Sequence, residues 1–287
     1  MGTIKKFCIA CLLFVLPIMV FYMAKAAYMM TGEKYKQALH GSEIYTSIDK
    51  SKKKTKLKRL IIGDSTANQY FDNREDNDSL YSLACNQAVS VCGHFFLLNN
   101  FLQAGNRPQE VYLLFNAFSF KNNLDQIYTY HYFLKPFYTD EYKPLMTPTV
   151  LEQIRKVPYH ALCQNPLILT SSWAPDYYPE KGDYTFLSPI SREYLEKMDS
   201  LSRLYDFDFY IVPSVINENL KEDVAHIDRN EFRHEGYAEK LTRFIDNIVY
   251  LNDTCFMDGT HLNHPLAYKH LIESNMSIIM EAQDKRK

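Results

Sequence analysis

Two short segments of the 287-residue chain carry residue types that can form a hydroxyl nucleophile and its base. The first is Gly-Asp-Ser-Thr at residues 63–66, and the second is Asp-Gly-Thr-His at residues 258–261. A serine hydroxyl becomes a useful nucleophile when an imidazole takes its proton and an acid orients that imidazole. We therefore predict that Ser65 attacks, that His261 acts as the base and that Asp258 orients the base.

The surrounding sequence predicts elements that would bring these segments together. Short apolar runs predict strands, and longer runs with a helical apolar spacing predict helices. The predicted strands are 57–62, 82–89, 111–116 and 207–212, and the predicted helices are 93–103, 190–205 opened by Ser191, 231–250 and one that begins at Pro265. Their alternation predicts an α/β fold with a mostly parallel sheet and helices on both faces. Ser65, the stretch after Val89 and Asn116 would then lie at the carboxyl edge of the sheet, where such folds bind ligands.

A long insertion at about 118–190 interrupts this alternation. It is rich in tyrosine, phenylalanine and proline. Long segments of this kind often carry function, so we interpret it as a lid or an acceptor-binding surface. An accessory packing region without a ligand is the equally weighted alternative.

The amino-terminal segment predicts a membrane anchor. Residues 7–24 contain no charged side chain, and about 20 apolar residues span a bilayer. We expect an uncleaved single-pass helix within residues 1–30, with a cleaved signal sequence as the alternative. Lysines flank it on both sides, so charge does not fix the orientation. We expect the large domain on the periplasmic, extracytoplasmic side, because long trailing domains translocate largely regardless of charge.

The remaining organisation is a linker at 31–56 followed by one domain at 57–287. A basic run at 50–59 can contact anionic headgroups or a polyanionic glycan, although a solvated approach to the first strand is the favoured interpretation. The net charge of −2 gives no reason to expect nucleic acid as a partner. Four cysteines of the domain, Cys85, Cys92, Cys163 and Cys255, permit two disulfides or buried thiols.

Four short blocks in this order resemble the SGNH (GDSL-type) hydrolase superfamily. Gly63-Asp64-Ser65 matches its nucleophile block, and Asp258 to His261 matches its final Asp-x-x-His block. Residues 86–91 look like the second block without its glycine, and residues 114–117 look like the third block and keep Asn116. The resemblance spans residues 58–275. It implies a flavodoxin-like three-layer sandwich, a Ser-His-Asp triad and no cofactor or metal.

The resemblance also implies an oxyanion hole, because acyl transfer develops negative charge on the carbonyl oxygen. The expected donors are the backbone N–H groups of Ser65 and Val91 and the side-chain amide of Asn116. Gly93 would replace Val91 if the alignment of the second block slips by two residues. Two alternatives concern the triad itself: Ser65 only caps a helix, or His264 takes the place of His261.

Membrane-tethered members of this superfamily acylate envelope polymers beside a multi-pass membrane acyltransferase. The resemblance therefore implies an O-acyltransferase, specifically an O-acetyltransferase, that modifies a cell-surface polysaccharide. A carbohydrate or lipid esterase that removes acyl groups is the first alternative. A non-catalytic glycan-binding subunit is the second. Substrate-binding residues cannot be assigned from the sequence.

Overall fold

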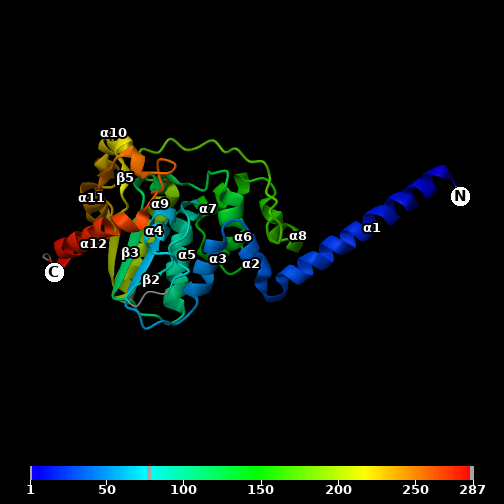
Figure 1. Ribbon diagram of the computed structural model, residues 1–287, viewed down its shortest axis with the longest axis horizontal. Helices are drawn as coiled ribbons and strands as arrows, with labels where there is room; N and C mark the ends of the chain where they lie inside the picture. Colours follow the sequence, from blue (N-terminus) through cyan, green and yellow to red (C-terminus); the bar gives the residue numbers. More distant parts are fainter. Residues whose placement is uncertain (1, 76–78, 285–287) are drawn as a thin grey trace.

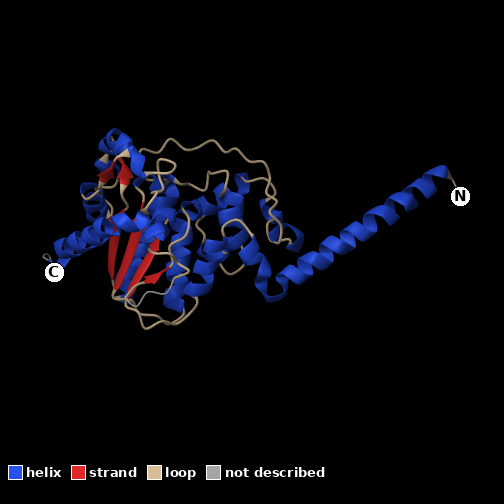
Figure 2. Cartoon of the chain, in the orientation of Figure 1, coloured by secondary structure: helices blue, strands red, loops and turns tan. Residues whose placement is uncertain are grey.

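Four short parallel strands form the central sheet of the domain (Figures 1 and 2). The structure is a computed structural model that describes residues 2–75 and 79–284. The spatial order is β2-β1-β3-β4. The strands are β1 (Arg59–Gly63), β2 (Tyr81–Ser82), β3 (Glu110–Phe115) and β4 (Asp208–Pro213). The α/β class and the mostly parallel sheet are therefore as the sequence predicts.

The register aligns the carboxyl ends of the three longer strands. Gly63 of β1 pairs with Leu114 of β3, and Phe115 of β3 pairs with Pro213 of β4. Residues that directly follow these strands therefore gather at one edge. This is the edge at which the sequence places Ser65 and Asn116.

The predicted strand at 82–89 is mostly wrong. Only Tyr81–Ser82 forms a ladder with β1, although Cys85 N–H still donates to Gly63 O at 2.9 Å. The Asn86 side chain then accepts a hydrogen bond from Ala88 N–H and caps a 3-10 turn at Gln87–Val89. Asparagine readily bonds to nearby backbone in this way, and that local bond ends the strand.

Alternating strand residues bury against helices on opposite faces of the sheet (Figure 1). Leu60 and Ile62 belong to a core that includes α3 (Ser42–Ser51), α5 (Ser90–Gln103), α9 (Pro189–Tyr205) and α11 (Ala238–Asp246). Ile61 belongs to a second core with α4 (Ser65–Tyr70) and α12 (Lys269–Asp284). Each fully buried aliphatic or aromatic side chain stabilises the fold by about 1.5–3 kcal/mol.

The predicted helices exist, but their ends differ. Helix α5 begins at Ser90 and not at residue 93. The cap of α9 is Ser188, whose Oγ accepts from Ser191 N–H at 3.1 Å, so Ser191 does not open that helix. Within the helix predicted at 231–250, the α-helix is the shorter α11, Ala238–Asp246. Residues Tyr250–Leu251 instead form β6, which pairs in parallel with β5 (Ile216–Asn217). Pro265–Tyr268 is a 3-10 turn that leads into α12.

Helix α1 (Thr3–Met30) projects away from the domain (Figure 1). It is long and apolar enough to cross a membrane, and nearly all of its residues are exposed. The predicted membrane-capable helix within residues 1–30 is therefore present.

Residues 31–56, expected to be a linker, are mostly helical. They contain a 3-10 turn at Thr31–Glu33, α2 (Lys34–Ala38) and α3. Ile44 is fully buried and Ile48 nearly so, in the core that α3 shares with α5. Only the basic stretch from residue 53 to the start of β1 is extended, and its lysine side chains are largely exposed.

The insertion between β3 and α9 contains several short helical elements, followed by a segment without helix or strand at 171–188. Its elements are η3 (Ala117–Lys121), a π-helical turn at Tyr130–Leu134, α6 (Lys135–Phe137), η5 (Lys143–Leu145), α7 (Pro148–Lys156), η6 (His160–Leu162) and α8 (Pro166–Leu169). Many of its rings, including Tyr130, Phe133, Phe137 and Tyr142, are buried in the core shared with α5 and α9. Packing therefore accounts for these rings.

The remaining short helical elements lie between β5 and α12. They are η7 (Glu218–Leu220), α10 (Lys221–Ala225), η8 (Arg229–Glu231) and η9 (Asp253–Cys255). All four cysteines of the domain are free thiols, and Cys85, Cys92 and Cys163 are buried.

Candidate active site

The turn from β1 into α4 determines where Ser65 lies. A Cβ atom on Gly63 would lie 2.2 Å from the carbonyl oxygen of Leu114, so only glycine fits beside β3. Asp64 follows with extended backbone and is the N-cap of α4. Ser65 is therefore the first residue of the helix, at the carboxyl end of β1. Because Asp64 provides the cap, the capping alternative does not account for Ser65.

The Asp64 carboxylate is buried and accepts five hydrogen bonds. Its Oδ1 accepts from Thr66 N–H at 2.9 Å, from Thr66 Oγ1 at 2.5 Å and from Ala67 N–H at 3.3 Å. Its Oδ2 accepts from Asn116 N–H at 2.8 Å and from Ser119 Oγ at 2.6 Å. One carboxylate thus joins the start of α4 to the segment that follows β3.

The side chains of Ser65, His261 and Asp258 lie in a continuous hydrogen-bonded series. His261 Nε2 is 2.8 Å from Ser65 Oγ, and His261 Nδ1 is 2.8 Å from Asp258 Oδ2. With the proton on Nδ1, the ring donates to Asp258 and leaves Nε2 to accept from the Ser65 hydroxyl. The structure therefore brings together the three residues that the sequence singles out, in the order that nucleophile activation requires.

A tight loop holds Asp258 and His261 in this arrangement. Met257 N–H donates to His261 O at 2.7 Å, and Gly259 has φ +78°, which glycine adopts without strain. Asp258 Oδ1 accepts from the main-chain N–H groups of Thr260 and His261. The bond from the His261 main chain, helped by the His261 ring and by Thr260, lowers the pKa of Asp258 to about 2. The carboxylate therefore stays ionised beside the imidazole across the ordinary pH range.

Gln69 connects the serine helix to the histidine loop. It lies four residues after Ser65 on α4, on the same side of the helix. Its Oε1 accepts from Leu262 N–H at 3.1 Å, and its Nε2 donates to Leu262 O at 3.3 Å. Leu262 directly follows His261 and is buried. The spacing between the hydroxyl and the imidazole is thus held by two hydrogen bonds.

Asn116 has its side-chain amide available as a donor. Its Oδ1 accepts from Phe118 N–H at 3.0 Å, which identifies the oxygen and the nitrogen of the amide. Its Nδ2 has no hydrogen-bond partner within residues 2–75 and 79–284. Since Asn116 N–H is bonded to Asp64, the residue that precedes Ser65, this residue is anchored to the turn between β1 and α4.

The segment expected to supply a second oxyanion donor contains a strained residue. Ser90 has φ +58° and ψ 174°, a conformation that is nearly restricted to glycine. Its N–H donates to Gln87 O and its Oγ donates to Asn122 O at 3.0 Å. Val91, the expected donor, is buried in the first turn of α5, where helical N–H groups lack partners within the helix.

Gly93 does not have a glycine-specific backbone. It lies inside α5, and a Cβ atom there would lie 2.6 Å from Val89 Cβ. Its missing side chain therefore permits close packing. The position in this segment whose backbone suits glycine is Ser90.

His264, the rival base, makes no side-chain hydrogen bond in the part of the chain that the structure describes. It is exposed and precedes the 3-10 turn at Pro265–Tyr268. The hydroxyl of Ser65 is bonded to His261 instead.

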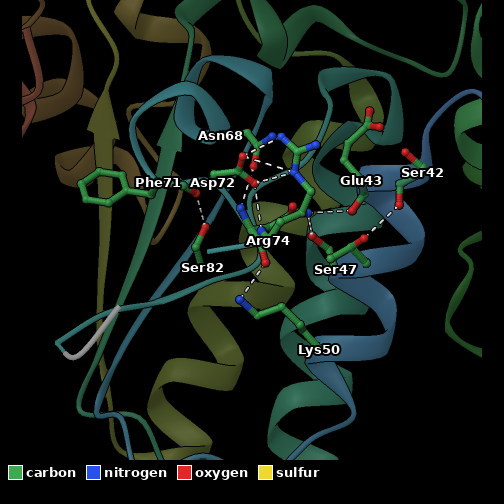
Figure 3. Close-up of polar contacts among 11 residues, drawn as sticks. Ser42, Glu43, Ser47, Lys50, Asn68, Phe71, Asp72, Arg74 and Ser82 are labelled. Carbon is green, nitrogen blue, oxygen red and sulfur yellow. Dashed lines mark hydrogen bonds and ion pairs between the residues drawn. The ribbon is translucent and has the colours of Figure 1, made fainter. Parts of the chain in front are cut away.

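The far end of α4 is tied to α3 by a polar network (Figure 3). Side chains of α3 and of the segment after α4 point towards one another there. Asn73, which is buried, donates through its amide to Ser47 Oγ at 2.7 Å and to Glu43 O at 2.6 Å. The main-chain carbonyl of Asn73 accepts from Lys50 Nζ at 2.7 Å, and its main-chain N–H donates to Asn68 Oδ1 at 2.9 Å. The helix that begins with Ser65 is therefore fixed at both ends.

Sequence reasoning gave no role to Ser119 or Gln69, and it named Asp64 and Ser90 only as members of the first and second blocks. A signal existed for Gln69, because its spacing of four from Ser65 places both on one face of a helix. The five partners of Asp64 include two that are more than 50 residues away, so no local pattern reveals them.

A scan against protein-family models finds no match for this chain, and a search of the curated proteins finds none either.

Proposed function

We propose that this protein is a serine-dependent acyl-transfer enzyme of the SGNH type with a flavodoxin-like three-layer fold. The hydrogen-bonded series of Ser65, His261 and Asp258 carries this proposal. The strand order β2-β1-β3-β4 supports the fold, since flavodoxin-like sheets begin with the same order.

The proposed reaction has two steps. His261 Nε2 takes the proton from Ser65 as its oxygen attacks the acyl carbonyl, and the same nitrogen then protonates the leaving alcohol. Asp258 stabilises the imidazolium that forms between these events. In the second step, His261 deprotonates the acceptor hydroxyl, which takes the acyl group from Ser65, and the same proton returns to Ser65 Oγ as that bond breaks.

The oxyanion that forms in both steps needs donors that are already in position. Asn116 Nδ2 is the best supported of these, because it is fixed through its own oxygen and has no partner in residues 2–75 and 79–284. The backbone N–H groups of Ser65 and Val91 complete the proposed hole. A single donor of this kind contributes about 2.7–4 kcal/mol to transition-state stabilisation.

The proposed acceptor is a hydroxyl group of a cell-surface polysaccharide, and the proposed acyl group is acetyl. Helix α1 would tether the enzyme to the cytoplasmic membrane with the domain on the extracytoplasmic side. A multi-pass membrane acyltransferase would supply the acyl group across the bilayer. The anchor supports this arrangement because it keeps the domain beside such a donor.

A carbohydrate or lipid acyl esterase is the second candidate. The Asp258 side chain is 57% exposed and that of His261 is 30% exposed. A transferase must keep water from its acyl-enzyme, and this degree of exposure favours hydrolysis.

The acetyl content of the surface polysaccharide tests these functions. It is measured in a deletion strain that is complemented with the wild-type gene or with Ser65→Ala. A transferase requires lower acetyl content in the deletion and no rescue by Ser65→Ala. Higher acetyl content in the deletion would identify an esterase, and full rescue by Ser65→Ala would identify a non-catalytic subunit.

A further inference from the structure

A group of exposed apolar side chains lies in the second half of the insertion. Tyr159, Leu162, Leu167 and Trp173 are between 43% and 61% exposed. These four residues are called the aromatic patch below. Large exposed apolar groups that gather in one place mark a surface that contacts something other than water.

A ring contact joins the two aromatic residues of the patch, and the two leucines lie between them in the chain. The rings of Tyr159 and Trp173 meet edge to face with centroids 6.0 Å apart. Leu162 ends the short turn that follows Tyr159, and Leu167 lies on α8 between them and Trp173. Both rings are therefore presented with these leucines on neighbouring turns.

The patch lies beside the membrane-spanning helix. Helix α8 contacts α1, and Figure 1 shows α8 next to the carboxyl-terminal end of α1. On α8, Leu169 is buried in a cluster with Tyr35 and Leu39 of the α2 region and Met29 of α1. One side of α8 is thus covered by the base of the anchor, while Leu167 remains exposed.

This part of the chain also lacks charge. No Asp, Glu, Lys or Arg occurs from residue 157 to residue 175, although charged residues make up 23% of the chain. An exposed surface in water normally carries charged side chains. Tyrosine and tryptophan, in contrast, are enriched where a protein meets the headgroup region of a bilayer.

A buried lysine fixes the loop that carries Trp173. Lys135 Nζ donates to Ser171 O at 2.7 Å and to Trp173 O at 2.9 Å. These bonds satisfy two main-chain carbonyls internally, which lowers the cost of moving the loop out of bulk water.

We propose that the aromatic patch inserts into the interfacial region of the lipid bilayer beside α1. The bilayer is the occupant that the position suits, because the membrane-spanning helix ends beside α8, which carries Leu167. The domain would then have a fixed orientation on the membrane and would not move freely on a tether. This proposal does not depend on the enzymatic function.

Trp173 provides a direct probe, because it is the only tryptophan of the chain. The full-length protein is reconstituted into nanodiscs of phosphatidylcholine with or without bromine atoms near the headgroup end of the acyl chains. Insertion predicts that Trp173 loses more than half of its fluorescence in the brominated lipid. Equal fluorescence in the two lipids would overturn the proposal and would indicate a surface for a protein partner.

Two sets of variants make the measurement specific. Tyr178 lies five residues after Trp173, on the segment that leads away from the patch towards α9, so Tyr178→Trp in a Trp173→Phe background should be quenched far less. Leu167→Glu should reduce the quenching of Trp173, whereas Leu204→Glu, at an exposed position of α9, should leave it unchanged. Unchanged quenching in Leu167→Glu would contradict insertion of the patch.

Discussion

Replacement of Asp64 by asparagine tests whether one buried carboxylate holds the turn between β1 and α4. Asparagine has almost the same shape but only one acceptor oxygen. If that oxygen faces Thr66 and Ala67, the new NH₂ group faces Asn116 N–H and the Ser119 hydroxyl. The hydroxyl can turn to Gln87 Oε1, which is 3.2 Å away, but the Asn116 N–H loses its acceptor.

The cost follows from these contacts. One buried unsatisfied N–H costs about 1–3 kcal/mol. The remaining bonds also weaken, because a neutral acceptor replaces an ionised one. We therefore expect Asp64→Asn to lower the free energy of unfolding by about 2–4 kcal/mol, which corresponds to a fall in Tm of roughly 5–15 °C for a domain of this size.

Circular dichroism during thermal unfolding of the detergent-solubilised protein measures this change. Thr66→Val is the matched control, because it removes one hydroxyl donor to the same carboxylate and keeps the charge. It should cost only about 1 kcal/mol. A wild-type Tm in Asp64→Asn, or a larger loss in Thr66→Val than in Asp64→Asn, would refute the reasoning.

Further outcomes are expected at Gln69, Ser90 and Asp258. Gln69→Ala should lower kcat towards an activated acyl ester by about 10–10²-fold with little change in KM, because it frees the loop at Leu262. Gln69→Glu keeps one of the two bonds, so its kcat should lie between those of the wild type and Gln69→Ala. A changed KM with an unchanged kcat would contradict this. Ser90→Gly should be more stable than Ser90→Ala by about 1 kcal/mol in thermal unfolding, because a residue with a Cβ atom is strained at φ +58°. In an ordinary helix alanine is the more stable of the two, and that order here would contradict the prediction. Asp258→Asn should lower kcat by about 10²-fold or more. The pKa of Asp258 is lowered from 3.8 to about 2, so its carboxylate stabilises the fold above about pH 3.8 and loses this effect as the pH falls towards 2. The difference in free energy of unfolding between the wild type and Asp258→Asn should therefore vanish near pH 2. A difference that persists at that pH would count against the pKa shift.

The parts of the fold that the sequence predicted are those with a strong local signal. Apolar runs gave three of the four sheet strands to within about two residues, because each strand is buried on both faces. The turn between β1 and α4 was predictable because Gly63, Asp64 and Ser65 each suit one step of it. The membrane-capable helix was predictable from its length and composition alone.

The parts that were missed depend on distant partners. The helix α3 has apolar positions that are informative only once α5 packs against them. The strand expected at 82–89 ends early because the Asn86 side chain captures a backbone N–H, and both outcomes are compatible with the local sequence. The two hydrogen bonds between Gln69 and Leu262 cross 193 residues of sequence, so only the folded chain reveals them.

Reaction with a fluorophosphonate tests the central claim most directly, because such probes label activated serine hydroxyls. The intact mass of the full-length protein is measured after incubation, and the modified peptide is then mapped. The account predicts a single adduct on Ser65 that is absent from Ser65→Ala and forms far more slowly in His261→Ala. A folded wild-type protein that stays unlabelled, or a Ser65→Ala variant that is labelled at the wild-type rate, would contradict it.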